Sequence, residues 1–421
     1  MAARLVVVSV DGLRPEGYLY KSGTLGQLAH EGAWAEALIP IYPSLTMPCH
    51  ASIVTGTSSA KHGIQANAIF NPNDVHNWKQ GESKDFYLQS AHFKAPPIWD
   101  LAEQNGYRTC VLHWPTSLGA NVSWCLPEVF DPQNPHDYWE PAARHATPEL
   151  RRLVERHPDF VETRDRYDLD RNLLIAFEIA LNRLGADVVM LHIDSLDHDI
   201  HDHGRGSPRV LSTYAFIEEM VAAVFERVDL TQTDVLVFGD HGALNFTKRI
   251  NINSLFREQG WLDVQDDKIV SWKAIAHTSC ATAPIYVREP ALEAEVLDFL
   301  HANSAAGYVV LERSMLAGYD AFPEAICAID SLPGYSMGQG LTCEFITTEK
   351  TPRGEHGHIP IYPELDAGLF ARGPSFEAPL NLGRFPQTEI FPIMQRLLGL
   401  TPARSAKPGV QFTESTSGLF M

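Results

Sequence analysis

The chain has 421 residues, of which 45% are hydrophobic, 10% aromatic and 20% charged, a composition typical of a globular protein. This length allows either one large α/β domain with an insertion or two domains. The formal net charge of −19 argues against a nucleic-acid polymer as the main partner, because phosphate backbones are bound by clustered Lys and Arg and the sequence has no such cluster.

The first predicted element is a strand at residues 5–10, an apolar run typical of a strand buried on both faces of a parallel sheet. It ends at Asp11. A second strand is predicted for residues 34–39. The stretch YPSLTMPCHASIVTG at 42–56 then predicts a short helix that begins near Thr46.

Strands and helices alternate after this segment. The next runs predict helix 97–104, strand 108–114, helix 168–184, strand 187–193, helix 210–228 and strand 234–238. Repeated strand–helix–strand units imply a mostly parallel sheet with helices on both faces. We therefore predict an α/β fold with one sheet sandwiched by helices.

Acidic residues follow three of the predicted apolar strands. They are Asp11, a cluster at 194–199, and Asp240. In open parallel sheets, ligands gather at the carboxyl ends of the strands. The three groups of acids are therefore expected to converge on one edge of the sheet.

The texture of the sequence changes after about residue 251, where shorter elements include a predicted strand–helix–strand unit at 285–311. The chain then returns through residues 343–348 to a predicted strand at 368–371 and a last helix at 388–398. We predict a catalytic core formed by residues 1–250 and 344–421, with a smaller α+β cap domain inserted at 251–343.

The densest cluster of candidate metal ligands is DSLDHDIHDHG at residues 194–204. It contains three overlapping Asp-x-x-x-His pairs: Asp194 with His198, Asp197 with His201, and Asp199 with His203. A spacing of four residues on a helix puts both side chains on one face, where they can hold one ion. Spacing alone leaves the register open. A solvated polar loop is the alternative, but Asp240-His241 at the same sheet edge favours metal.

A histidine-rich loop, GEHGH at 354–358, supplies a further ligand. Imidazoles and carboxylates without thiolates suit Zn²⁺ or Mn²⁺. The expected design is two divalent ions roughly 4 Å apart, the usual clamp for in-line displacement at phosphorus. Such ions would also offset the overall negative charge for a small phosphorylated substrate.

At this point the motifs match a known family. In order they are DGLR at 11–14, PSLTMPCHASIVTG at 43–56, HGIQAN at 62–67, DHDIHDHG at 197–204, GDHG at 239–242 and GEHG at 354–357. This order resembles the alkaline phosphatase superfamily, most closely its type I phosphodiesterase/nucleotide pyrophosphatase branch. The resemblance runs from Val6 to the last helix, and only residues from about 251 to 343 are unmatched.

The resemblance implies a role for each matching residue. Thr46 would be the nucleophile, and Asn67 would bind phosphate. The resemblance also favours Asp197 with His201 over Asp194 with His198. The implied ligands are Asp11, Thr46, Asp240 and His241 for one ion and Asp197, His201 and His356 for the other.

The implied activity is a metal-dependent hydrolysis of phosphodiester or pyrophosphate bonds through a phosphothreonine intermediate. The alternative for Thr46 is that its side chain only caps the helix. Two departures from the family pattern concern the substrate: Met47 replaces the usual aromatic after the nucleophile, and Cys49 replaces an asparagine. A nucleotide is therefore a candidate substrate that the motifs do not establish.

Three alternative functions remain open. A phosphonate hydrolase of the phosphonoacetate hydrolase type shares the metal ligands, but Trp114-Pro115 resembles the diesterase pattern instead. A phosphomonoesterase needs an extra cation, for which Arg14 and Lys61 are the candidates near the motifs. A non-catalytic phosphate-binding protein would have lost the nucleophile or ligands, and none is lost.

The predicted cap contains aromatic residues that either form its core or line a pocket, namely Trp261, Trp272, His277, Tyr286 and Tyr335. The chain enters an apolar strand almost at once and has no stretch of membrane-spanning length, so neither a signal peptide nor a membrane partner is expected. Six scattered cysteines without a C-x-x-C pair are typical of reduced thiols. We predict a cytoplasmic protein.

Overall fold

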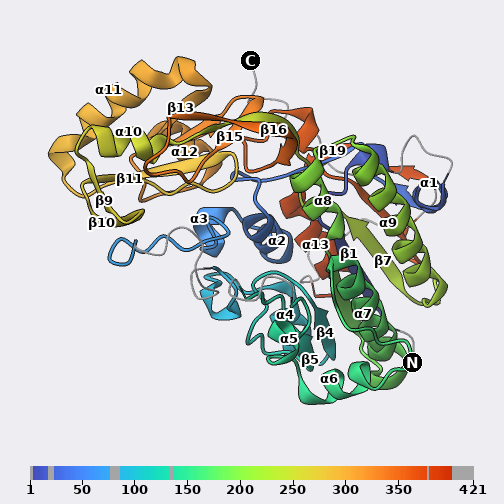
Figure 1. The fold of residues 1–421 in the computed structure, drawn as a ribbon. Coiled ribbons are helices and arrows are strands. Elements are labelled where there is room, and N and C mark those ends of the chain that lie inside the picture. Colours follow the sequence, from blue (N-terminus) through green and yellow to red (C-terminus); the bar gives the residue numbers. More distant parts are fainter. Residues whose placement is uncertain (1–2, 18–22, 76–85, 132–136, 377–378, 401–421) are drawn as a thin grey trace.

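The computed structural model describes residues 3–17, 23–75, 86–131, 137–376 and 379–400. Its largest element is an eight-stranded sheet (Figure 1). The strand order is β18 (Leu380–Asn381), β2 (Ala33–Trp34), β17 (Leu369–Arg372), β7 (Asp234–Phe238), β1 (Leu5–Val10), β6 (Val188–Ile193), β4 (Thr109–Leu112) and β5 (Trp124–Leu126). The five strands from β7 to β5 are parallel, and β17 is antiparallel to both of its neighbours. The predicted mostly parallel sheet is confirmed.

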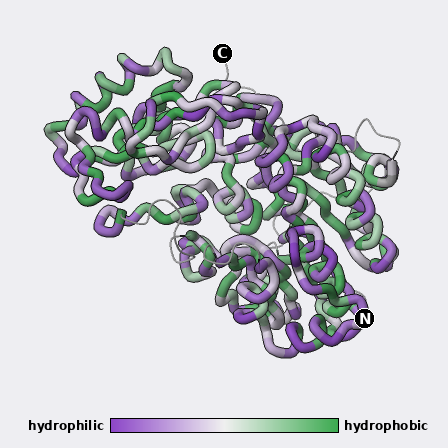
Figure 2. Tube along the Cα trace, viewed as in Figure 1, coloured by the Kyte–Doolittle hydropathy of each residue, from purple (hydrophilic) through white to green (hydrophobic). Residues whose placement is uncertain are grey.

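Helices cover both faces of this sheet, and apolar side chains of the central strand alternate between them. Val6 and Val8 of β1 pack into one core cluster, whereas Leu5 and Val7 pack into the other. The first cluster includes residues of α1 (Thr24–His30), α6 (Pro148–Glu155), α7 (Arg166–Ile179) and α9 (Pro208–Glu226). The second includes α2 (Thr46–Thr55), α4 (Ile98–Gln104) and α13 (Ile390–Leu397). The outer helix turns carry hydrophilic stretches (Figure 2).

Two predicted elements differ from the observed ones. The strand expected at 34–39 is divided, because its first part joins β17 while β3 (Ala37–Ile39) pairs with β19 (Arg384–Pro386) in a separate two-stranded sheet. The helix expected at 168–184 begins earlier, since the Asp165 side chain caps it, and its last turn, Ala180–Leu184, is π-helical.

A second region contains a four-stranded sheet ordered β11 (Ala274–Ala276), β12 (Thr282–Val287), β14 (Cys327–Ser331) and β13 (Tyr308–Glu312). Helices α10 (Ile252–Glu258), α11 (Glu293–Asn303) and α12 (Arg313–Tyr319) accompany it, with the hairpin β9 (Leu262–Gln265) and β10 (Lys268–Trp272). The predicted strand–helix–strand unit is present as β12, α11 and β13, but β14 lies between the two strands.

A three-stranded sheet is formed by β15 (Gly334–Met337), β8 (Leu244–Ile250) and β16 (Ile346–Glu355), and its strand β15 contacts β12 and β14 of this region. Strand β8 precedes the proposed cap in sequence, β15 lies inside it and β16 follows it. The division at residues 251 and 343 stays a prediction. The remaining α-helices of the described residues are α3 (Ser59–His62), α5 (Glu140–Ala143) and α8 (Ser195–His203).

Within the described ranges, no helix combines the length and the apolar character that crossing a bilayer requires. The cytoplasmic location stays a prediction.

Candidate active site

The carboxyl ends of three neighbouring strands bring the acids together, as the sheet rule predicts. Asp11 follows β1, Asp240 follows β7, and α8 begins directly after β6. Gly12 adopts a φ of +74°, and its backbone N–H donates to Asp240 Oδ1 at 3.2 Å. Glycine suits this left-handed turn, which brings the end of β1 next to Asp240.

Asp11, Asp240 and His241 form one compact set, which we name the inner ion group. Their ligand atoms all lie within 4.8 Å of one another. His241 Nε2 is 3.1 Å from Asp240 Oδ2 and 3.5 Å from Asp11 Oδ1. Thr46 Oγ1 lies 3.3 Å from the same nitrogen, so the proposed nucleophile faces this group.

Asp197, His201 and His356 form a second set, the outer ion group, whose ligand atoms also lie within 4.8 Å of one another. His201 Nε2 is 3.1 Å from Asp197 Oδ2, as expected for residues one helical turn apart. The rings of His241 and His356 stack with centroids 3.7 Å apart. The two groups are therefore adjacent.

Each histidine of these groups is oriented by a backbone carbonyl. The Nδ1–H groups of His241, His201 and His356 donate to the carbonyl oxygens of Gly242, Gly354 and Ser44 at 3.2, 3.1 and 2.9 Å. Such bonds fix the tautomer and leave Nε2 available for a metal ion. His201 Nε2 and His356 Nε2 are only 3.1 Å apart, a separation that requires a proton or a cation between two lone pairs.

Carboxylate oxygens at the centre of both groups also lack donors. Asp11 Oδ1, Asp240 Oδ2 and Asp197 Oδ1 are buried and accept no hydrogen bond from any described residue. An unpaired buried carboxylate oxygen is costly unless a cation compensates it. The donor set of imidazole and carboxylate therefore fits two divalent ions of the Zn²⁺ or Mn²⁺ type.

The two groups differ in their electrostatics. Burial and the neighbouring Asp197 raise the pKa of Asp11 well above its usual value, and burial and Asp11 do the same to the pKa of Asp240. In the outer group, burial opposes charging, but His201 and His356 hold the pKa of Asp197 below its usual value. Burial likewise opposes the His201 imidazolium, yet Asp197 and Glu355 raise its pKa to about 10.

Thr46 is the first residue of α2, and Leu45 rather than Thr46 holds the N-cap position. The side chain of Thr46 is thus free to face His241. Asn67 Oδ1 accepts the backbone N–H of Met47 at 3.0 Å, which places the asparagine beside the nucleophile. The geometry speaks against a capping role alone for Thr46.

Thr46 and Asn67 open into a cavity of about 620 Å³ that also reaches the outer ion group. Met47, Phe86 and Phe130 form an apolar part of its wall. The candidate site is therefore accessible to a small organic phosphate.

The structure distinguishes the three Asp-His registers of α8. Asp194 pairs with Arg166, His198 lies 3.7 Å from Asp202, and Asp199 accepts from Thr213 at 2.5 Å. Among the three pairs, Asp197 with His201 joins His356.

The two cationic residues predicted near the site, Arg14 and Lys61, form contacts outside the cavity. Arg14 contacts the backbone of Pro363 and Glu364, and Lys61 pairs with Asp320 at 3.0 Å. The guanidinium groups that line the cavity are instead those of Arg166, Arg249 and Arg353. They come from three separate elements, so no local sequence motif predicts them as a set. Arg353 alone lies near a predicted site residue, three positions before His356.

The aromatic residues singled out in the predicted cap belong to its core. Trp261, Trp272 and His277 are buried, and Tyr286 and Tyr335 pack partly buried against the same apolar cluster. The described cavity wall includes none of the five.

Known proteins resemble this chain in sequence over most of its length. A family model described as type I phosphodiesterase/nucleotide pyrophosphatase matches residues 5–357. An uncharacterized pyrophosphatase/phosphodiesterase of Schizosaccharomyces pombe is 26% identical, with 94% of this chain and 77% of the relative covered. Human ectonucleotide pyrophosphatase/phosphodiesterase family member 1 is 21% identical over 94% of this chain, which spans 40% of that protein's length.

Among solved structures, an inactive variant of murine ectonucleotide pyrophosphatase/phosphodiesterase 5 in complex with AMP superposes with a TM-score of 0.68. The sequence identity is 18%, and the match covers 95% of this chain and 96% of the murine one. The likeness confirms the alkaline phosphatase-like α/β fold.

Proposed function

The chain belongs to the type I phosphodiesterase/nucleotide pyrophosphatase family and is a hydrolase, and we propose that Thr46 is the nucleophile with which it cleaves phosphodiester or pyrophosphate bonds. The observation that carries this proposal is the position of Thr46 Oγ1, 3.3 Å from Nε2 of His241, which belongs to the inner ion group. A hydroxyl is a weak nucleophile unless its environment favours the alkoxide.

The inner ion group with Thr46 would hold one divalent ion and the outer ion group a second, with Zn²⁺ proposed first and Mn²⁺ second. When bound, such ions neutralise phosphate charge and favour the threonine alkoxide. Their fit rests on the orphaned oxygens of Asp11, Asp197 and Asp240.

The residues of the chain then position the reaction. Thr46 Oγ1 attacks phosphorus in line and gives up its proton to solvent. The bond from phosphorus to the leaving group breaks, the leaving group departs with the bonding electron pair, and a threonine phosphate ester remains. Water cleaves this ester and restores the hydroxyl. Because Asn67 is anchored to Met47 N–H through its oxygen, its amide nitrogen is the end that would donate to a phosphate oxygen.

The proposed substrate is a nucleotide or another small organic phosphate that places an apolar group against Met47, Phe86 and Phe130. The AMP bound to the murine relative supports a nucleotide-like ligand. Met47 packs on rings less specifically than an aromatic residue, so a broader range of organic groups is expected.

One observation favours a second candidate, phosphomonoester hydrolysis. Arg166 lines the cavity and could bind the additional negative charge of a monoester. However, Arg166 is already paired with the buried Asp194, which lowers its attraction for a dianion.

The test compares kcat/KM of the zinc-loaded enzyme for an aryl phosphodiester and for the matching aryl phosphomonoester. We expect a strong preference for the diester that is abolished in Thr46→Ala and partly retained in Thr46→Ser, which keeps a hydroxyl. Preference for the monoester would favour the second candidate. Activity that survives in Thr46→Ala, or no activity on either ester, would contradict the proposal and direct attention to phosphonates.

A further inference from the structure

A third set of donor side chains lies beside the inner ion group. We name it the lateral cluster: His113, Glu128, His192 and Asp194. Ligand atoms of His113, Glu128 and His192 all lie within 4.8 Å of one another, and His113 Nε2 is 3.9 Å from Asp194 Oδ2. Donors that share one ion are separated by distances of this order, because each metal–ligand bond measures roughly 2 Å.

The lateral cluster is built by the same sheet edge as the catalytic site. His113 directly follows β4, Glu128 lies two residues beyond β5, His192 is within β6 and Asp194 follows that strand. Strands β5, β4 and β6 are adjacent and parallel, so their carboxyl ends meet. The convergence is a product of sheet topology rather than of one flexible loop.

Several atoms of the lateral cluster are buried without a partner. The His113 side chain is almost completely buried, and within the described ranges neither of its ring nitrogens forms a hydrogen bond. Glu128 Oε2 and Asp194 Oδ1 lack donors in the same way. Buried polar groups are normally satisfied, and these four atoms in one cluster are groups that a bound cation would satisfy.

The backbone of His113 is held in an uncommon conformation. Its φ is +55°, in the left-handed region that is strained for a non-glycine residue. Two hydrogen bonds maintain it: the N–H donates to the Leu126 carbonyl at 2.6 Å, and the carbonyl accepts from His192 Nδ1 at 3.0 Å. This backbone conformation holds the His113 imidazole next to Glu128.

The local charge balance leaves room for a cation. Glu128, Asp194 and the fully buried Asp170 face one guanidinium, that of Arg166. Both carboxylate oxygens of Asp170 lack donors among described residues. Three carboxylates and one guanidinium give a formal charge of about −2, which one divalent ion would neutralise.

We propose that the lateral cluster is a third divalent-metal site, with His113, Glu128, His192 and Asp194 as its donors. Two imidazoles with carboxylates suit a first-row ion such as Zn²⁺ or Mn²⁺. Glu128 and Asp194 line the catalytic cavity, which gives the ion a path of entry. This inference does not depend on the proposed reaction.

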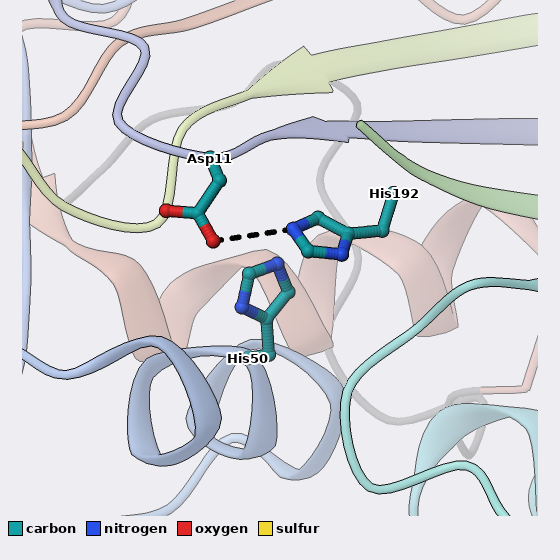
Figure 3. Close-up of side chains that lie close together, drawn as sticks. All are labelled: Asp11, His50 and His192. Carbon is teal, nitrogen blue, oxygen red and sulfur yellow. Dashed lines mark hydrogen bonds and ion pairs between the residues drawn. The ribbon is translucent and has the colours of Figure 1, made fainter. Parts of the chain in front are cut away.

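His192 connects the lateral cluster to the inner ion group. Its Nε2 lies 3.2 Å from Asp11 Oδ2, and the His50 ring lies close by, with its centroid 4.5 Å from that of His192 (Figure 3). His192 forms two hydrogen bonds, through Nδ1 to the His113 carbonyl and through Nε2 to Asp11 Oδ2. An ion bound by His192 in the lateral cluster would replace one of them and would thereby change how His192 holds Asp11 Oδ2.

The experiment counts metal ions in the full chain after loading with Zn²⁺, or separately with Mn²⁺, and exhaustive dialysis. We expect three ions per chain in the native protein under at least one load, and two in Glu128→Gln and His113→Ala. His198→Ala is the matched control, because His198 lines the same cavity but is not a lateral donor, and it keeps three.

Two outcomes would overturn the third site: two ions per native chain under both loads, or an unchanged third ion in Glu128→Gln. The first would mean that protonated histidines balance the carboxylates instead. Should His113→Ala fail to fold, the nearly isosteric Glu128→Gln decides, with at least tenfold weaker binding of the third ion counting as loss. Because no readout uses turnover, failure of the proposed reaction is detected separately.

Discussion

The inner and outer ion groups lie side by side but are built differently. The inner group has two carboxylates and one imidazole, with Asp11, Asp240 and His241 almost wholly buried. The outer group has one carboxylate and two imidazoles, and the His201 side chain is 28% exposed. All three residues of the outer group line the cavity, whereas Asp11 is the member of the inner group that does so.

The difference indicates a division of labour. In the inner group, burial disfavours the charged carboxylates and neighbouring acids repel them. Both effects raise the pKa of Asp11 and Asp240. The outer group is already balanced by its own histidines. We therefore expect the inner ion to be held as a fixed part of the fold beside Thr46, and the outer ion to exchange more readily where the leaving group departs.

Removal of one carboxylate from each group should have the largest effect. We expect Asp240→Asn and Asp197→Asn each to lower kcat/KM on the order of 10³-fold or more, because the groups act as a unit. Each variant should also retain one zinc ion fewer by elemental analysis. Asp229→Asn, which alters an exposed acid that precedes β7 and belongs to neither group, is the control. Equal zinc content in all three proteins would contradict the two-group description.

Asn67 probes the inner side of the site without touching a metal ligand. We expect Asn67→Ala to lower kcat by about 10²-fold, the usual cost of losing one donor to a developing phosphate charge. Zinc content should not change. A loss of bound zinc equal to that of Asp240→Asn would show that Asn67 supports the fold of the inner group rather than the reaction.

The pH dependence of zinc binding separates the groups further. The pKa of His201 is about 10 in the metal-free protein, so this imidazole carries a proton below that pH and must lose it to bind an ion. Zinc affinity of the outer group should therefore rise by about tenfold per pH unit between pH 7 and 9. A chelator competition in Asp240→Asn, where the inner group is disabled, measures this slope. A flat profile would contradict the charge state assigned to His201.

The smallest effect is expected at Arg353. Its Nε donates to the His201 carbonyl at 3.1 Å and its Nη2 binds Asp202 at 2.7 Å, so it fixes α8 against β16. Arg353→Gln should weaken outer zinc binding by about tenfold, the usual scale for a residue behind a ligand, and leave inner binding unchanged. Arg209→Gln, which removes an ion pair with Asp199 on the same helix, should change neither.

Local motifs made much of the catalytic site predictable. Asp197 and His201 are one helical turn apart, and Asp11 and Asp240 end buried parallel strands, so spacing and sheet topology already indicated that these side chains converge. His356 directly follows β16 after a long excursion of the chain. The histidine-rich motif at 354–358 indicated a further ligand, and the family resemblance singled out His356 and assigned it to the outer group.

The lateral cluster and the cavity arginines could not be predicted in the same way. His113, Glu128 and Arg166 are single residues that belong to no recognisable motif. They come together because β5, β4 and β6 are neighbouring strands and because α7 begins at Arg166. One signal was available: His192 interrupts a strand that is otherwise apolar, and a buried histidine in such a run needs a partner. The division of the strand at 34–39 depended on distant residues 383–386, which no local pattern reveals.

In the proposed reaction, Thr46 attacks phosphorus directly and water acts only in a second displacement. The most direct test is the stereochemical course of hydrolysis of a phosphodiester analogue made chiral at phosphorus by sulfur substitution, carried out in ¹⁸O-labelled water. Two successive in-line displacements predict retention of configuration in the product. Inversion would mean a single attack by water and would contradict the role assigned to Thr46.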